Sequence, residues 1–283
     1  MKKLWILVLI LFIVSSINAQ DVVATQEQVN KFFKTKTYVV YDDNIFNTYN
    51  DQIKKSVELN WNITPVAFIT TAEFEKLKSD VNSSFLIRTK ITFDDDKNFV
   101  AYTFLSLLLG GNFGSVNNMP TLCSFPLSYY NVDYDRYIYK LGSITKFMQN
   151  HMILCRENPN LTSKNIIQYY NNNVENIGSK TLYVLTDELD SDVNTESKIA
   201  AVYKGKVVLT ETEEIEKLIA DKDPDALFLH KVGAPEDSDQ KSRCFKLIMG
   251  AADGKLYYTD HHKINEKNGD GFLKSDFKKL SRK

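Results

Sequence analysis

Apolar and polar positions along this chain follow the periods of helices and strands, and one strand-and-helix pattern occurs twice. Residues 66–80 read VAFITTAEFEKLKSD and residues 207–221 read VVLTETEEIEKLIAD, with seven identities among fifteen positions at a constant offset of 141. In each block a short apolar run precedes apolar residues spaced three apart, which predicts a buried strand leading into an amphipathic helix. Thr71 and Glu73 favour a helix start, since a hydroxyl caps free amides and a carboxylate suits the positive helix end. We therefore interpret the chain as a duplication.

The rest of the pattern predicts the same order of elements in both halves. Residues with a 3.6-residue period predict helices at 25–33, 46–57, 137–155, 163–173 and 274–280. Apolar or alternating runs predict strands at 38–41, 85–93, 99–109, 122–130, 181–185, 226–232, 244–249 and 255–262. In the second half, a shortened helix follows the polar loop at 190–195 and precedes the repeated block. Each half then has the order α-β-α-β-α-β-β-β-α. This order predicts an α/β (α+β) fold built as a tandem duplication of a mixed-sheet unit with helices packed on the sheet.

The two ends of the first half set the expected domain organisation. Lys2 and Lys3 precede an unbroken apolar run from Leu4 to Val14, which is typical of a secretory signal peptide with cleavage near Ala19. The run is shorter than the roughly 20 residues of a membrane-spanning helix, so we expect no membrane span after cleavage. A polar segment with Pro159 separates the halves. We expect a signal peptide at 1–19, a first α/β repeat at 20–157 and a second at 158–283, in a protein that is periplasmic or secreted.

Charge and cysteine content narrow the class of protein. Removal of residues 1–19 takes away two lysines and leaves 33 basic and 36 acidic side chains, a net charge of −3. This balance does not resemble the basic stripe of a nucleic-acid-binding protein, so we expect no nucleic-acid partner. Three cysteines allow one disulfide in an exported chain, and the sequence leaves open whether Cys123 pairs with Cys155.

The order of elements, with an apolar strand after an acidic turn as at Asp223 to Leu229, resembles that of several periplasmic α/β domains. These are the domains of the curli-secretion lipoprotein, of the lipoprotein activators of penicillin-binding proteins and of the amino-terminal part of TolB. The composition, rich in Asn, Lys, Ile and Tyr, is similar to that of uncharacterised exported proteins of Bacteroidetes. The resemblance implies a periplasmic α/β domain.

Two acid pairs occupy matching places, directly after the first strand of each half. They are Asp42 with Asp43 and Asp187 with Glu188. Ligands of α/β sheets gather at the carboxyl ends of strands, and paired carboxylates there can hold Ca²⁺ or Mg²⁺ or act as an acid and a base. The alternative is that they cap the following helices, where negative charge is favoured in any case. We expect no cofactor, and these four residues are the candidates for a metal site.

Other local motifs match only in part. Asp190, Asp192 and Asn194 have calcium-loop spacing but lack the glycine and the closing glutamate. Asn268, Asp270 and Gly271 also fit in part, but Phe277 occupies the closing position. No complete nucleophile, zinc or phosphate-loop motif occurs. The sequence therefore favours a non-enzymatic envelope protein that binds a protein or a small ligand. The alternative is an exported hydrolase or metal-dependent enzyme that uses the four acidic residues.

Overall fold

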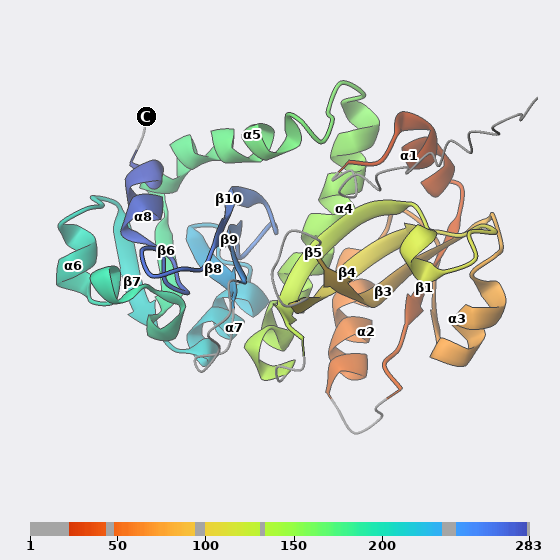
Figure 1. The fold of residues 1–283 in the computed structure, drawn as a ribbon, viewed down its shortest axis with the longest axis horizontal. Coiled ribbons are helices and arrows are strands. Elements are labelled where there is room, and N and C mark those ends of the chain that lie inside the picture. The colour runs from red at the N-terminus through yellow and green to blue at the C-terminus, as the bar shows by residue number, and fades with distance from the viewer. Residues whose placement is uncertain (1–22, 44–47, 94–99, 131–133, 234–241, 282–283) are drawn as a thin grey trace, which may run out of the picture.

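The chain folds into two units, each a five-stranded mixed sheet with helices packed against it (Figure 1). The computed structural model describes residues 23–43, 48–93, 100–130, 134–233 and 242–281. The predicted signal peptide and the acidic segments 94–96 and 236–239 lie outside the described residues. Among the residues that are described, no helix is long and apolar enough to cross a membrane. The α/β class and the two similar sheet units are as the sequence predicts, and they are consistent with a tandem duplication.

The first unit has the strand order β2-β1-β3-β4-β5, in which β1 is parallel to both of its neighbours and the last pairs are antiparallel. Its strands are β1 (Lys36–Val40), β2 (Val66–Ile69), β3 (Ser83–Thr92), β4 (Ala101–Leu109) and β5 (Thr121–Tyr129). Its helices are α1 (Gln26–Phe32), α2 (Tyr49–Asn60), α3 (Thr71–Leu77) and α4 (Leu141–Glu157), with short 3₁₀ turns η1 (Val116–Asn118), η2 (Tyr134–Arg136) and η3 (Ile138–Lys140).

The second unit repeats this topology with the order β7-β6-β8-β9-β10. Its strands are β6 (Thr181–Leu185), β7 (Lys206–Thr210), β8 (Ala226–Val232), β9 (Arg243–Gly250) and β10 (Leu256–Lys263). Its helices are α5 (Ile166–Asn171), α6 (Glu196–Ala200), α7 (Thr212–Asp221) and α8 (Lys274–Leu280), with 3₁₀ segments η4 (Asn172–Ser179), η5 (Thr186–Glu188) and η6 (Ser191–Val193). The helix predicted at 163–173 is thus shorter than expected and continues as the 3₁₀ segment η4.

Strand register shows which residues of the two units are equivalent. In the first unit Tyr38 pairs with Ala67 on one side and with Phe85 on the other. In the second unit Tyr183 pairs with Val208 and with Phe228. The offset of 141 between Ala67 and Val208 is the one that aligns the duplicated sequence block. The repeated sequence therefore occupies the same place in both sheets.

The duplicated block begins its helix one residue earlier than the sequence predicts. The cap of α3 is Thr70, whose hydroxyl oxygen accepts from the Glu73 amide, while the Glu73 carboxylate accepts from the Thr70 amide. Thr71 is the first helical residue. The backbone bond from Thr70 is the main cause of the lowered pKa of Glu73, because it stabilises the charged carboxylate.

Helix α4 lies between the two sheets and joins them into one core (Figure 1). Its buried side chains include Ser143, Ile144, Thr145, Phe147 and Met148, which cover more than half of its circumference, while Lys146 and Asn150 on the remaining side are half-buried. So wide a buried face lets one helix pack against two layers. The same apolar cluster contains residues of β4 and β5 from the first unit and of β8 and β9 from the second.

Helix α8 is attached to the second sheet through a buried ion pair. Lys246 Nζ lies 2.7 Å from Asp276 Oδ2, and both side chains are almost completely excluded from solvent. Tyr258 donates its hydroxyl to Asp276 Oδ1 at 2.8 Å. The backbone amide of Leu273 donates to Asp276 Oδ2, which closes the start of the helix. The partners satisfy both oxygens of this buried carboxylate, as burial of a charge requires.

Candidate functional site at the junction of the two units

The four candidate carboxylates lie where the topology predicts a site. Strand β1 has β2 on one side and β3 on the other, and β6 likewise lies between β7 and β8. The chain reverses its winding direction at such a strand, and ligands of open α/β sheets bind at its carboxyl end. Asp42 follows β1 by two residues, and Asp187 and Glu188 lie in η5 directly after β6. The question is what each carboxylate contacts.

Asp42 is held on all sides by groups of its own unit. Its carboxylate forms an ion pair with Arg88 of β3, and the two side chains are 17% and 20% exposed. Its backbone amide donates to Asn50 Oδ1, and Asn50 Nδ2 donates back to its carbonyl. The Arg88 guanidinium lies 4.4 Å from the centroid of the Tyr49 ring. Asp43, the other member of the pair, is exposed.

The second acid pair is divided between surface and interior. Asp187 Oδ2 accepts from Arg136 Nη1 at 3.0 Å in an ion pair that is more than half exposed. Glu188 Oε1 lies 2.9 Å from Lys140 Nζ, with 8% of the glutamate side chain and none of the lysine exposed. Exposed pairs contribute little to stability, whereas a buried charge without its partner is costly. Glu188 therefore belongs to the core of the junction.

One connecting segment, residues 136–140, contacts the second acid pair directly and Asp42 of the first pair through Arg88. Arg136 contacts Asp187 and Lys140 contacts Glu188, while the Tyr137 hydroxyl accepts from Arg88 Nη1 at 3.3 Å. Arg88 in turn holds Asp42 of the first unit. The segment leads directly into α4, so its side chains are fixed by the buried start of that helix. Asp187 and Glu188 thus form an ionic clasp between the two units, whereas Asp42 is linked to this segment within the first unit through Arg88.

Lys140 is the centre of this clasp. Its ammonium also donates to the Leu229 carbonyl at 2.9 Å and lies 5.1 Å and 5.9 Å from the ring centroids of Tyr139 and Phe228. Burial, the largest single effect, would lower the pKa of Lys140, but the Glu188 carboxylate and the Tyr139 hydroxyl together outweigh burial and the pKa is raised. The lysine is therefore charged at neutral pH. Glu188 Oε2 has no hydrogen-bond partner among the described residues.

Two buried histidines are neutral near this core. His230 Nε2 lies 2.8 Å from the Pro126 carbonyl of β5, and burial together with Lys140 lowers the pKa of His230 to about 3. His151 of α4 lies 2.7 Å from the Tyr170 hydroxyl, and burial lowers its pKa to about 4. Neither imidazole is positioned as a surface acid or base.

The three cysteines are buried free thiols. Cys155 Sγ lies 3.5 Å from His151 Nε2, but burial raises the pKa of Cys155 to about 11. Burial also raises the pKa of Cys123 and of Cys244. A thiol with a raised pKa is protonated at neutral pH and is therefore a poor nucleophile.

The structure brings together the two segments with partial calcium-loop spacing. The Asp190 amide donates to the Phe272 carbonyl, and Asp190 Oδ1 accepts from the Asp192 amide as the cap of η6. Asp270 forms an ion pair with Lys231. Within the described ranges, no group of three or more His, Cys, Asp or Glu side chains is arranged to hold a metal ion. Asp190 and Asp270 thus have roles in the local fold.

Sequence reasoning missed the cations of this site. Arg88 lies 46 residues from Asp42 and Lys140 lies 48 residues from Glu188, so no local spacing marks either pair. A lysine inside the apolar stretch YIYKLGSI was the available signal, because a lysine is rarely buried without a partner.

Comparison of the chain with protein-family models, with curated proteins and with solved structures finds no match.

Proposed function

We propose that the mature chain is an exported, non-enzymatic binding protein of the cell envelope. The observation that carries the proposal is the engagement of three candidate carboxylates by cations. Asp42, Asp187 and Glu188 each form an ion pair, with Arg88, Arg136 and Lys140. Asp187 and Glu188 join the two units and Asp42 pairs within the first, so these carboxylates serve the structure. Contact with other molecules is then left to the rest of the surface.

The signal peptide expected at 1–19 supports the location, and the tandem arrangement supports a role in binding. Two units with one shared core present a rigid surface with several edges and helix faces. Partners of such pre-organised surfaces bind with little loss of conformational entropy. The chemical class of partner that we expect is another envelope protein.

Two measurements test the proposal. The purified mature chain is first used to capture envelope proteins, and each captured protein is then purified and titrated against the chain. We expect saturable binding of at least one of them. In parallel, glycan, peptide and phosphoester substrates are tested with the wild-type chain and with the exposed-site variants Asp43→Asn and Asp187→Asn. Turnover that is lost in either variant overturns the proposal, as does the absence of any saturable partner.

Titration of the chain with Ca²⁺, Mg²⁺ and Zn²⁺ distinguishes a metal-dependent enzyme from the proposed binding protein. Functional calcium sites have dissociation constants of about a millimolar or tighter. A site of that strength that disappears in Asp43→Asn favours the metal-dependent enzyme over the binding protein.

A further inference from the structure

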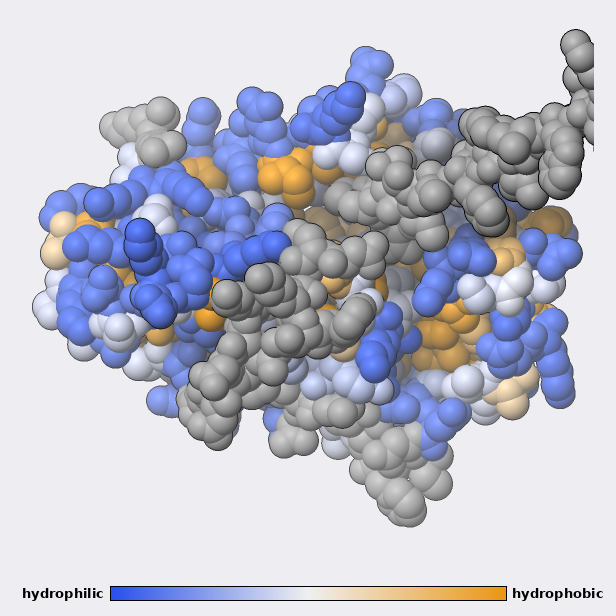
Figure 2. All heavy atoms as spheres, viewed as in Figure 1, coloured by the Kyte–Doolittle hydropathy of each residue, from blue (hydrophilic) through white to orange (hydrophobic). Residues whose placement is uncertain are grey.

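The buried pair of Lys246 and Asp276 has the arrangement from which an amine and a carboxyl group can form an amide. Lys246 lies on β9 and Asp276 on α8, and their side chains are 1% and 0% exposed. Lys246 Nζ lies 2.7 Å from Asp276 Oδ2. Figure 2 shows hydrophilic side chains on the surface around α8, so the helix faces solvent on its outer side and encloses the pair on its inner side.

The surroundings of the pair are aromatic and exclude water. Phe272 and Phe277 are both fully buried, with ring centroids 4.9 Å apart, and the Tyr258 ring lies 5.9 Å from that of Phe272. Two charges are costly to hold in such a place. Transfer of one proton across the short contact removes both charges, because it leaves a neutral amine beside a neutral carboxylic acid. Burial therefore favours the forms of the two groups that can react with each other.

Two hydrogen-bond donors already hold the carboxyl oxygens of Asp276. The Leu273 amide donates to Oδ2 at 2.8 Å, and the Tyr258 hydroxyl donates to Oδ1 at 2.8 Å. Attack of a nitrogen on the carboxyl carbon places negative charge on these oxygens, and fixed donors in a dry site stabilise that charge. The Tyr258 hydroxyl also lies 3.1 Å from Asp260 Oδ2, so a second carboxylate is within reach of a proton in transit.

We propose that Lys246 and Asp276 condense to an intramolecular isopeptide bond. The bond forms between Lys246 Nζ and Asp276 Cγ, and the bond from Cγ to one carboxyl oxygen breaks. Of the three ammonium protons, one stays on the amide nitrogen and two leave with that oxygen as water, so no other reactant takes part. Well-oriented groups within one molecule react as if each were present at about 10⁵–10⁸ M, which opposes the preference of free amines and acids for their ions in water.

The bond would fix the last helix to the sheet covalently. It closes residues 246–276, which include most of β9, all of β10 and the start of α8, into one loop. This inference does not depend on the proposed binding function, because it concerns a reaction within the chain.

The other buried lysine–carboxylate pair lacks the second requirement. Lys140 Nζ lies 2.9 Å from Glu188 Oε1, and the two side chains are 0% and 8% exposed. Glu188 Oε2, however, has no hydrogen-bond partner among the described residues, and Lys140 also donates to the Leu229 carbonyl. No donor is in place to stabilise charge on the glutamate oxygens, so we expect no amide at this pair.

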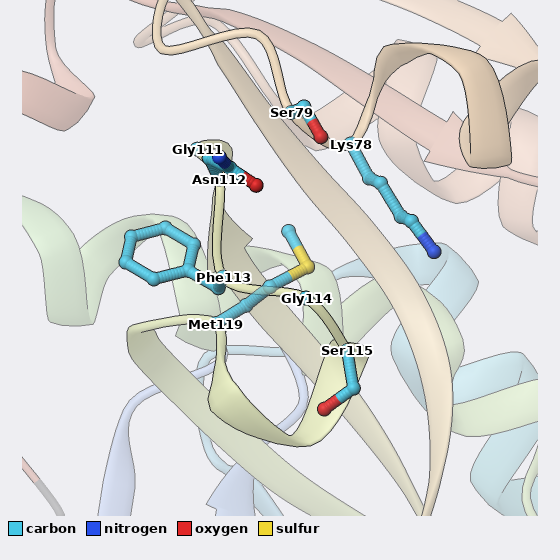
Figure 3. A pocket seen from close by; sticks show the side chains of 8 residues that line it. All are labelled: Lys78, Ser79, Gly111, Asn112, Phe113, Gly114, Ser115 and Met119. Carbon is cyan, nitrogen blue, oxygen red and sulfur yellow. The ribbon is translucent and has the colours of Figure 1, made fainter.

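A short distance is not sufficient either. Lys78 Nζ lies 2.6 Å from Glu75 Oε2, but the glutamate side chain is 53% exposed. Lys78 lies at the rim of a hollow of about 130 Å³ that residues 111–115 also line (Figure 3). Water solvates both groups there, so they remain ions. Burial and fixed donors together distinguish Lys246 and Asp276.

Mass spectrometry of the purified chain under denaturing conditions tests the proposal. We expect a mass lower by one water molecule than the mass calculated from the sequence. A protease digest should contain the peptide with Lys246 joined to the peptide with Asp276. Lys246→Arg keeps a positive charge but lacks the primary amine, and it should keep the full mass. Lys140→Arg, the same replacement in the other buried pair, is the matched control and should lose water like the wild type.

The rate of bond formation tests the part assigned to Tyr258. Removal of one donor of this kind slows a reaction by about 10²–10³, so Tyr258→Phe should form the bond at least about tenfold more slowly in chain made by cell-free synthesis and sampled at intervals. Tyr257→Phe, at the neighbouring buried tyrosine, is the control and should keep the wild-type rate.

Thermal unfolding followed by circular dichroism checks that all variants fold. The proposal is overturned if the folded wild-type chain keeps its full mass, if the digest joins other residues, or if folded Lys246→Arg loses water. Wild-type kinetics in Tyr258→Phe would overturn the part assigned to that hydroxyl. Should the arginine variant fail to fold, the wild-type mass and the joined peptides still decide.

Discussion

The buried pair of Lys140 and Glu188 provides the sharpest test of how the two units are held together. The substitution Lys140→Met removes the ammonium but keeps an unbranched apolar side chain of similar length. Glu188 then remains in the core with 8% of its side chain exposed, and the Leu229 carbonyl loses its donor. Removal of one partner of a buried ion pair costs about 3–5 kcal/mol, because the remaining charge is buried without compensation.

Denaturant unfolding followed by circular dichroism measures this cost, and a double-mutant cycle isolates the pair. Glu188→Leu should be destabilising by a similar amount, since it leaves a buried ammonium. The double variant should recover most of the loss, because a well-packed apolar pair is often as stable as a buried ion pair. Asp187→Asn, at the half-exposed pair of the same junction, should change the free energy of unfolding by less than about 0.5 kcal/mol. The reasoning fails if Lys140→Met costs less than about 1 kcal/mol, or if the double variant is as unstable as the sum of the singles.

Three further predictions concern the core. Leu218→Ala should cost about 2–5 kcal/mol in denaturant unfolding, and Leu77→Ala less, because only Leu218 is buried; equal costs would contradict the difference in burial. Gly254→Ala should lower the free energy of unfolding by at least about 1 kcal/mol, because Gly254 has φ +62° and lies against the α4 backbone. Gly178 has open space around it, so Gly178→Ala should leave the free energy of unfolding nearly unchanged. A Gly254→Ala chain as stable as the wild type would refute the close approach. Burial lowers the pKa of His230 to about 3, so the contribution of the neutral imidazole to the free energy of unfolding is complete above pH about 6.5 and is lost as the pH falls toward 3. His230→Gln should therefore reduce the loss of stability between pH 6.5 and 3. An unchanged dependence of the free energy of unfolding on pH would contradict this prediction.

Local sequence pattern was sufficient to predict the elements of each unit and their order. The repeated strand and helix carry their own signals, namely an apolar run and apolar residues three apart, and these signals do not depend on the rest of the chain. The α/β class followed from the alternation of strands and helices. The predicted start of α3 was wrong by one residue, because Thr70 and Thr71 both carry a hydroxyl that can cap a helix. Only the backbone conformation shows that Thr70 is the cap.

The contacts between the units were not predictable in this way. Arg136 and Lys140 reach carboxylates that lie 51 and 48 residues away in sequence. Within the first unit, Arg88 likewise reaches a carboxylate 46 residues away. Helical spacing predicts an apolar face on the segment that became α4, but it does not say that a second sheet covers the opposite face. The acid pairs were correctly placed after β1 and β6, yet what they contact depends on how two units pack.

The positions at which the two copies differ follow the path of α4. On the covered face of the second unit, Leu247 contributes to the shared core. Its equivalent in the first unit is Ser106, whose hydroxyl lies 2.7 Å from that of Thr89 and 2.9 Å from that of Ser124. Ile219 in contact with α4 likewise corresponds to Lys78 in the first unit.

Each replacement satisfies its polar group within the first unit, so that face is stable without an occupant. The second unit thus keeps an apolar face where α4 packs, with Leu247 and Ile219 in the shared cluster. The first unit keeps polar groups at the equivalent positions, and these groups pair with one another instead of with a helix.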